Sequence, residues 1–154
     1  MPSNEVRLNH VVDAPPAAVW AVLTDIDRAA ETLSGVSRVE RVAGSGYEVG
    51  TRWRETRRMM GKEATEEMWV SVVAPERRTV VEAHSSGTAY RTTFELTDLG
   101  GRTDLTMTFG ASQTAPSGFG RIMMAVFGRL AMRMTAKVMK QDLADIAARA
   151  EAAR

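Results

Sequence analysis

The chain has 154 residues and no cysteine, with 44% hydrophobic residues, 25% charged residues and a formal net charge of +1. This length suits one domain with a proper core, and the composition is that of a globular protein. Without cysteine there are no disulfides, no thiol nucleophile and no thiolate metal ligands, and the balanced charge favours no particular charged partner. The N-terminal residues lack a secretory signal pattern and no apolar run reaches the roughly 18 residues of a membrane span, so we expect a cytoplasmic protein.

The first elements are predicted to be a strand and two short helices. Apolar and polar residues alternate over positions 6–12, which is typical of a strand. The segment Ala14-Pro15-Pro16 ends this strand, and proline is tolerated in the first turn of a helix. The apolar stripe that follows predicts a helix from there to about Asp25, and a second short helix ends near Gly35.

Six further strands and one long helix are predicted after residue 36. The candidate strands are Val36–Val42, Thr51–Met60, Lys62–Val73, Arg78–Ser85, Thr88–Thr97 and Arg102–Ser112. Their connections are short, which predicts antiparallel pairing because a parallel return needs a longer crossover. After residue 118 the pattern is helical over about 33 residues, or about 50 Å. This helix is the only element long enough to cover one face of a seven-stranded antiparallel sheet.

This order of elements and three sequence segments resemble the SRPBCC superfamily, which includes START lipid-transfer domains and birch-pollen-allergen-like proteins. The segments are DAPPAAVW at 13–20 with Asp25, Gly50-Thr51-Arg52 at the start of the third strand, and VAPERR at 73–78. Within the superfamily the chain is most similar, over nearly its whole length, to the polyketide cyclase/dehydrase and lipid-transport group. The group includes carriers, cyclases and dehydratases, so the resemblance leaves the chemistry open.

The fold that the resemblance implies is an α+β helix-grip in a single START-like domain over residues 1–154. In this fold a curved seven-stranded antiparallel sheet wraps a long C-terminal helix, and two short helices connect strands 1 and 2. A cavity is left between the sheet and the C-terminal helix.

The hairpin expected over residues 52–69 combines many charges with large apolar side chains. A turn at Gly61-Lys62 would pair Arg57 with Glu66 across the two strands. The more apolar face, which is expected to point at the helix, holds Trp53, Glu55, Arg57, Glu66 and Met68. Buried charges are costly without partners, so the three charged groups should pair with one another or meet solvent or ligand. They form either a wet ion-pair network at the rim of the sheet or the polar end of a cavity that orients a hydroxyl, carbonyl or carboxylate.

The rest of a cavity wall is expected from the later strands and the terminal helix. A turn at Ser86-Gly87 places Glu82 opposite Arg91 on the outer face and the apolar residues inside. The ligand-binding candidates on these strands are Tyr90, Thr92, Phe94, Met107 and Phe109, and those on the helix are Met123, Phe127, Leu130 and Met134. Methionine adapts to varied apolar shapes, although such a stripe is also typical of an ordinary core.

Signals for catalysis are weak in this sequence. Glu55, Glu66 and His10 are the candidates for an acid or base, and a lone histidine on an apolar strand face is more often a core residue. The two histidines are not spaced as metal ligands, and neither a phosphate-binding glycine loop nor a Ser–His–Asp arrangement is present. We therefore expect no metal and no cofactor.

Three classes of function remain open. The first is binding of a small hydrophobic molecule of lipid, polyketide or aromatic type, and the second is a polyketide cyclase or dehydratase that uses a cavity acid or base. The third is a non-enzymatic regulatory or partner-binding protein that docks through Trp69 or a basic helix face. That face, which also suggests weak contact with a membrane surface, holds Arg129, Arg133, Lys137 and Lys140. Nucleic-acid binding is not expected, and the chain is expected to be a monomer or a homodimer.

Overall fold

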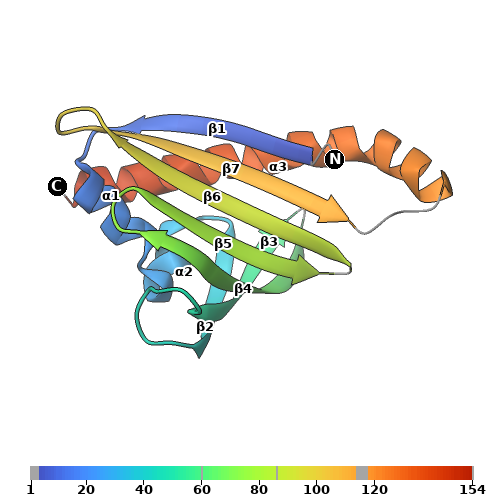
Figure 1. The fold of residues 1–154 in the computed structure, drawn as a ribbon, viewed down its shortest axis with the longest axis horizontal. Helices are drawn as coiled ribbons and strands as arrows, with labels where there is room; N and C mark the ends of the chain where they lie inside the picture. Colours follow the sequence, from blue (N-terminus) through green and yellow to red (C-terminus); the bar gives the residue numbers. More distant parts are fainter. Residues whose placement is uncertain (1–3, 60, 86, 114–117, 154) are drawn as a thin grey trace.

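Seven antiparallel strands form one curved sheet in this protein, and a long helix lies against its inner face (Figure 1). The computed structural model describes residues 4–59, 61–85, 87–113 and 118–153, with all their side chains except those of residues 4, 59, 85, 113 and 118–132. The elements are β1 Asn4–Val12, α1 Pro16–Leu23, η1 Ile26–Arg28, α2 Ala29–Thr32, β2 Val36–Ala43, β3 Arg52–Met59, β4 Lys62–Ala74, β5 Arg78–Ser85, β6 Thr88–Asp98, β7 Thr103–Gln113 and α3 Gly118–Ala152.

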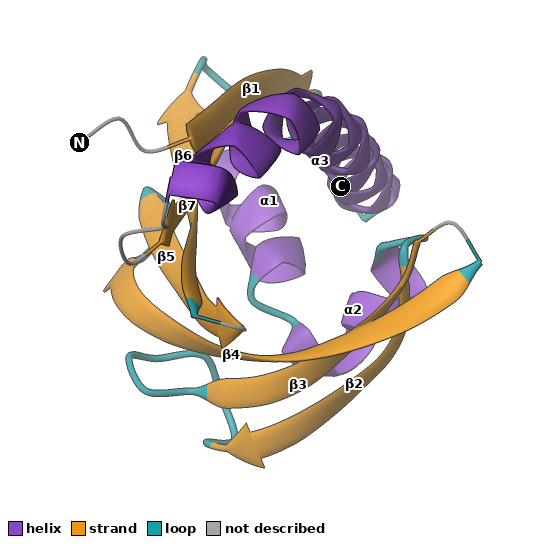
Figure 2. Ribbon diagram, turned by 90° about the vertical axis from the view of Figure 1, so that its right-hand side faces the viewer, coloured by secondary structure: helices purple, strands orange, loops and turns teal. Residues whose placement is uncertain are grey.

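The strand order β1-β7-β6-β5-β4-β3-β2 confirms the antiparallel helix-grip fold expected from the sequence. Viewed nearly along α3, the sheet curves around the helix, and α1 and α2 lie inside the curve (Figure 2). The short helices therefore close one side of the space between α3 and the distant strands. None of the described helices is both long and apolar enough to cross a membrane.

The register of the β3–β4 hairpin differs from the expected one by two residues. The strands pair Met59 with Lys62, so Arg57 lies opposite Ala64 instead of Glu66. Gly61 has a φ of 78°, a left-handed conformation that glycine adopts without steric cost, and this sets the turn one residue earlier than predicted. Because side chains alternate with period two, a shift of two residues leaves the inward and outward faces unchanged.

The β5–β6 hairpin has the expected register. Glu82 lies opposite Arg91, and the apolar positions of β6 lie opposite those of β7, with Phe94 paired to Met107.

Two separate apolar clusters hold most of the described core. One joins β1, β6 and β7 to α1 and α3, and it includes Val19, Leu105 and Leu143, which are at most 2% exposed. The other lies under β3, β4 and β5 and is built from Ile26, Trp53, Val70 and Val81. The inner face of the sheet thus carries two patches of apolar packing, and the space between them is where a cavity forms.

Candidate functional site

A cavity of about 110 Å³ lies between the two apolar clusters. The residues that line it are Val22, Leu23, Asp25, Ile26, Ala29, Thr32, Leu33, Tyr47, Trp53, Glu55, Arg57, Met68, Val81, Thr92, Phe94, Met107, Asp142 and Ile146. Most of these side chains are apolar, with a few polar groups among them, as in ordinary small-molecule sites. The volume is below the roughly 300–1,000 Å³ of sites for drug-sized ligands, so a molecule of about one ring fits this shape.

Arg57 supplies the fixed polar group of the cavity. Its Nε donates to Glu55 Oε2 at 2.8 Å, and its two terminal nitrogens donate to the two carboxylate oxygens of Asp142 at 3.1 and 2.8 Å. The side chains are 22% exposed for Arg57, 10% for Glu55 and 5% for Asp142. A guanidinium bound on two edges by carboxylates has little rotational freedom, so this group is held in one orientation.

The electrostatics of the cluster follow from burial and charge pairing. Burial on its own would lower the pKa of Arg57, but the charges of Glu55 and Asp142 outweigh it, so the pKa of Arg57 is raised. Burial raises the pKa of Asp142, and Arg57 opposes that rise. Both oxygens of Asp142 nevertheless accept N–H donors, which is the geometry of an ionised carboxylate.

The segment between α2 and β2 closes against this cluster. A Cβ placed on Gly35 would lie 3.3 Å from Nη1 of Arg57, so glycine allows the backbone to approach the guanidinium. The Gly35 carbonyl also accepts a hydrogen bond from the Arg58 N–H at 3.1 Å. Next to it, the N–H and hydroxyl of Ser34 donate to Asp145 on α3 at 2.9 and 2.8 Å. These bonds hold α3, β3 and the α2–β2 segment together around Arg57.

Glu66 does not take the expected place beside Arg57. It lies opposite Glu55 in the hairpin, and no hydrogen bond or ion pair joins its carboxylate to the described residues. Burial and the negative charge of Glu55 raise the pKa of Glu66, while Arg57 acts in the opposite direction. The cluster expected as Glu55, Arg57 and Glu66 is therefore built from Glu55, Arg57 and Asp142.

Tyr47, in the β2–β3 connection, brings a phenol to another part of the cavity wall. Its hydroxyl lies 2.7 Å from Thr79 Oγ1, which donates its only proton to the Val72 carbonyl at 3.0 Å. The Tyr47 hydroxyl is therefore the donor to Thr79, and its own lone pairs can accept from a ligand. The ring packs edge-on against Trp20 with 6.2 Å between centroids, and burial raises the pKa of Tyr47 although its hydrogen bond to Thr79 opposes the rise.

The residues expected to bind a ligand fall into three groups. Those that line the cavity are Trp53, Glu55, Arg57, Met68, Thr92, Phe94 and Met107, and those outside its lining are Glu66, Tyr90, Phe109 and Met134. The side chains of Met123, Phe127 and Leu130 lie outside the described residues.

Three of the expected candidates pack elsewhere. Tyr90 and Phe109 stack on each other at 5.7 Å, along the same inner face of the sheet. His10 lies on β1, half-buried and opposite Leu105 of β7, and it is not part of the cavity lining.

Sequence reasoning missed Asp142 and Ile146 of α3 and the lining residues of the short helices. Asp142 lies three residues after Met139 and four before Ile146, so the helical period places it on the same buried stripe. An acidic residue within an otherwise apolar helical stripe is the sequence signal that could have identified Asp142. No comparable pattern pointed to Tyr47 or to the lining residues from Val22 to Leu33.

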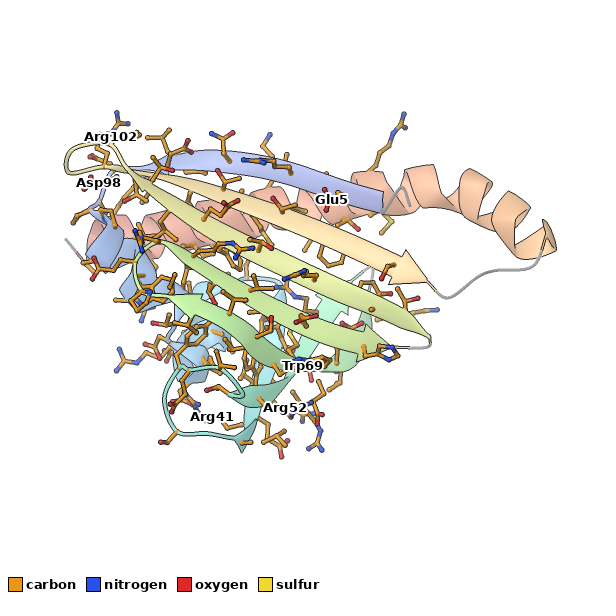
Figure 3. All side chains as sticks on the ribbon, in the orientation of Figure 1. Glu5, Arg41, Arg52, Trp69, Asp98 and Arg102 are labelled. Atoms are coloured by element: carbon orange, nitrogen blue, oxygen red, sulfur yellow. The ribbon has the colours of Figure 1, made fainter. Side chains whose placement is uncertain are left out.

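The residues expected to form docking surfaces are the basic side chains of α3 and Trp69. Arg133, Lys137 and Lys140 are exposed on α3, and the side chain of Arg129 lies outside the described residues. Arg52 lies over the ring of half-buried Trp69 at 4.8 Å on the β3–β4 part of the sheet (Figure 3). In the part of the chain that the structure describes, no three acidic or histidine side chains are grouped as metal ligands would be.

Known proteins share both the sequence pattern and the fold. The sequence matches the family described as polyketide cyclase / dehydrase and lipid transport over residues 4–151. Comparison with curated protein sequences gave no match.

Among solved structures, the fold is similar to that of TTHA0849 from Thermus thermophilus, with a TM-score of 0.80 and 23% identity over 97% of this chain and 99% of that one. It is also similar to the Zhui aromatase/cyclase from Streptomyces sp. R1128, with a TM-score of 0.74 and 18% identity over 97% and 94%. A START superfamily protein from Mycobacterium smegmatis has a TM-score of 0.66 and 13% identity over 94% and 99%. At these identities the likeness is one of fold.

Proposed function

The chain belongs to the polyketide cyclase/dehydrase and lipid-transport family, and from this premise we propose that it is a single domain that binds a small hydrophobic molecule between the sheet and α3. The observation that carries the proposal is the pairing of an apolar cavity with one immobilised guanidinium at its edge. Apolar burial supplies affinity, at about 25 cal/mol per Å² of surface removed from water. The fixed polar group supplies orientation.

Arg57 can still bind a ligand while it holds its two acids. A guanidinium has five N–H groups. Three of them donate to Glu55 and Asp142, which leaves two N–H groups for a carbonyl or hydroxyl oxygen. An orienting donor that is already held in place costs little conformational entropy when the ligand binds.

Calorimetric titration with neutral aromatic ketones tests this proposal. Acetophenone matches the size of the cavity, and 2-acetylnaphthalene is a larger probe that requires side chains to move. We expect saturable binding at one molecule per chain, with acetophenone bound at the residues that line the cavity in amide chemical-shift maps.

A matched pair of variants locates the binding site. Thr92→Phe fills the cavity from β6 and should abolish binding, whereas Thr93→Phe on the opposite face of the strand should leave it intact. Equal binding by both folded variants would refute the proposed site, and absence of saturable binding to the parent protein would refute the function.

A second candidate function is that of a cyclase or dehydratase acting on a polyketide-like or aromatic substrate. The observation that favours it is Glu66, a half-buried carboxyl with a raised pKa beside Glu55. Acids with perturbed pKa values cluster at catalytic sites, although Glu66 is not in the cavity lining. On an identified substrate, Glu66→Gln should lower kcat with little change in KM. Unchanged turnover in Glu66→Gln, Glu55→Gln and His10→Asn would eliminate this candidate.

A further inference from the structure

We infer that the cavity discriminates against carboxylates and other anions, and that Asp142 is the residue that sets this preference. The inference rests on the proposed ligand-binding function and names the charge class of the ligand. Its basis is the balance of charge at the cavity wall.

Acidic groups outnumber basic ones among the described residues that line the cavity. Asp25, Glu55 and Asp142 line it, and Arg57 is the one cation in that set. Asp25 is 43% exposed and lies 3.9 Å from Arg28, so its charge is largely screened by solvent and a neighbouring cation. The deciding group is therefore Glu55, Arg57 and Asp142, whose formal charges sum to −1.

Further acidic groups lie behind this cluster. Glu66 faces inward opposite Glu55, and burial together with the negative charge of Glu55 raises the pKa of Glu66. Asp145 lies one helical turn from Asp142, although Ser34 and Gln141 donate hydrogen bonds to it. These two acids add formal negative charge near the Glu55, Arg57 and Asp142 group.

The guanidinium cannot act as a free anion receptor in this arrangement. Asp142 occupies the bidentate face of Arg57 through two bonds of 3.1 and 2.8 Å, which is the face that binds carboxylates best. A ligand carboxylate would meet two single N–H groups and an uncompensated negative charge. A ketone or hydroxyl oxygen accepts from the same N–H groups without that repulsion.

Acetophenone and benzoate form a matched pair for this test, because one carries a methyl ketone where the other carries a carboxylate. At about pH 7 we expect the parent protein to bind acetophenone at least roughly tenfold more tightly than benzoate, as one uncompensated charge a few ångströms away requires in a partly screened site.

Asp142→Asn removes the charge and keeps the shape. It should raise the affinity for benzoate relative to that for acetophenone by roughly tenfold, because only the anion interacts with the lost charge. A purely structural role of Asp142 would weaken both ligands together. Glu55→Gln is the second variant, which is measured in the same way if Asp142→Asn does not fold.

The control is Glu67→Gln on the outer face of the same hairpin. Glu67 pairs with Arg52 at 2.9 Å, so the substitution also removes one carboxylate from an arginine pair, and it should leave the ligand preference unchanged. Equal affinity of the parent protein for both ligands would overturn the inference and leave the proposed function standing. Failure of both ligands to bind would overturn both the inference and the proposed function.

Discussion

Substitution of Arg57 by methionine should destabilise the protein far more than loss of an ordinary surface arginine. Methionine preserves much of the apolar stem but leaves Glu55 and Asp142 without their cation. These carboxylates are 10% and 5% exposed, so water cannot replace the lost partner fully. An uncompensated buried charge is costly in a low-dielectric interior.

The size of the effect follows from this burial. Removal of one partner of a buried ion pair typically costs about 3–5 kcal/mol, and the 22% exposure of Arg57 places the expected loss at about 3 kcal/mol. For a chain of this size that corresponds to a fall in Tm of about 6–12 °C. The matched control is Arg54→Met on the outer face of β3, where ion pairs of 3.8 Å join half-exposed side chains. The control should lose no more than about 1 kcal/mol.

Urea denaturation followed by circular dichroism gives the free energy of unfolding of each variant. A double variant, Arg57→Met with Asp142→Asn, should recover part of the lost stability, because it removes one of the two orphaned charges. The reasoning is refuted if Arg57→Met loses no more stability than Arg54→Met, or if the added Asp142→Asn makes the loss larger.

Three other substitutions probe the surroundings of the site. The pKa of Glu66 is raised in the native state, so above pH 4.5 the native protein binds more protons at this group than the unfolded chain does. The free energy of unfolding that Glu66 contributes therefore falls as pH rises through its raised pKa. Glu66→Gln should increase the free energy of unfolding, measured in urea, at about pH 7 but not at about pH 4. Gly35→Ala places a Cβ 3.3 Å from the Arg57 guanidinium, which its two carboxylates hold in place, and should lower the free energy of unfolding by about 1–3 kcal/mol. Gly46→Ala is the control, because a Cβ there has no atom within 4 Å, and it should change the free energy of unfolding little. Leu143→Ala, at a site 2% exposed, should cost about 2–5 kcal/mol in the same denaturation assay, and a loss below about 1 kcal/mol would show that the α3 cluster is loosely packed.

The elements and faces of this protein were predictable because they follow from local patterns. Alternating apolar residues identify a strand, and glycine-containing turns separate one strand from the next. The Arg57 side chain was expected to face inward, and it does, even though the hairpin register was wrong by two residues. A period of two tolerates that error, so the facing of each side chain is more predictable than its partner.

The partner of Arg57 was not predictable from the hairpin alone. Asp142 lies 85 positions further along the chain, and the two meet only because α3, which packs on β1 and α1, is held at one axial position and one rotation relative to β3. The axial position and the rotation of α3 depend on how Leu143 and Ile146 pack against the strands. These contacts join residues far apart in the sequence, so no short stretch of sequence contains the information.

The amino-acid sequence by itself determined the order of the elements, the inward face of each strand and the presence of charge on the inner face. Each of these depends on periodicity and turn residues within a few positions of the chain. Only the tertiary structure decided that Asp142 replaces Glu66 beside Arg57, and that the short helices and Tyr47 complete the cavity wall. Those outcomes depend on how distant elements dock, because the observed position of α3 both buries its apolar stripe and pairs Asp142 with Arg57.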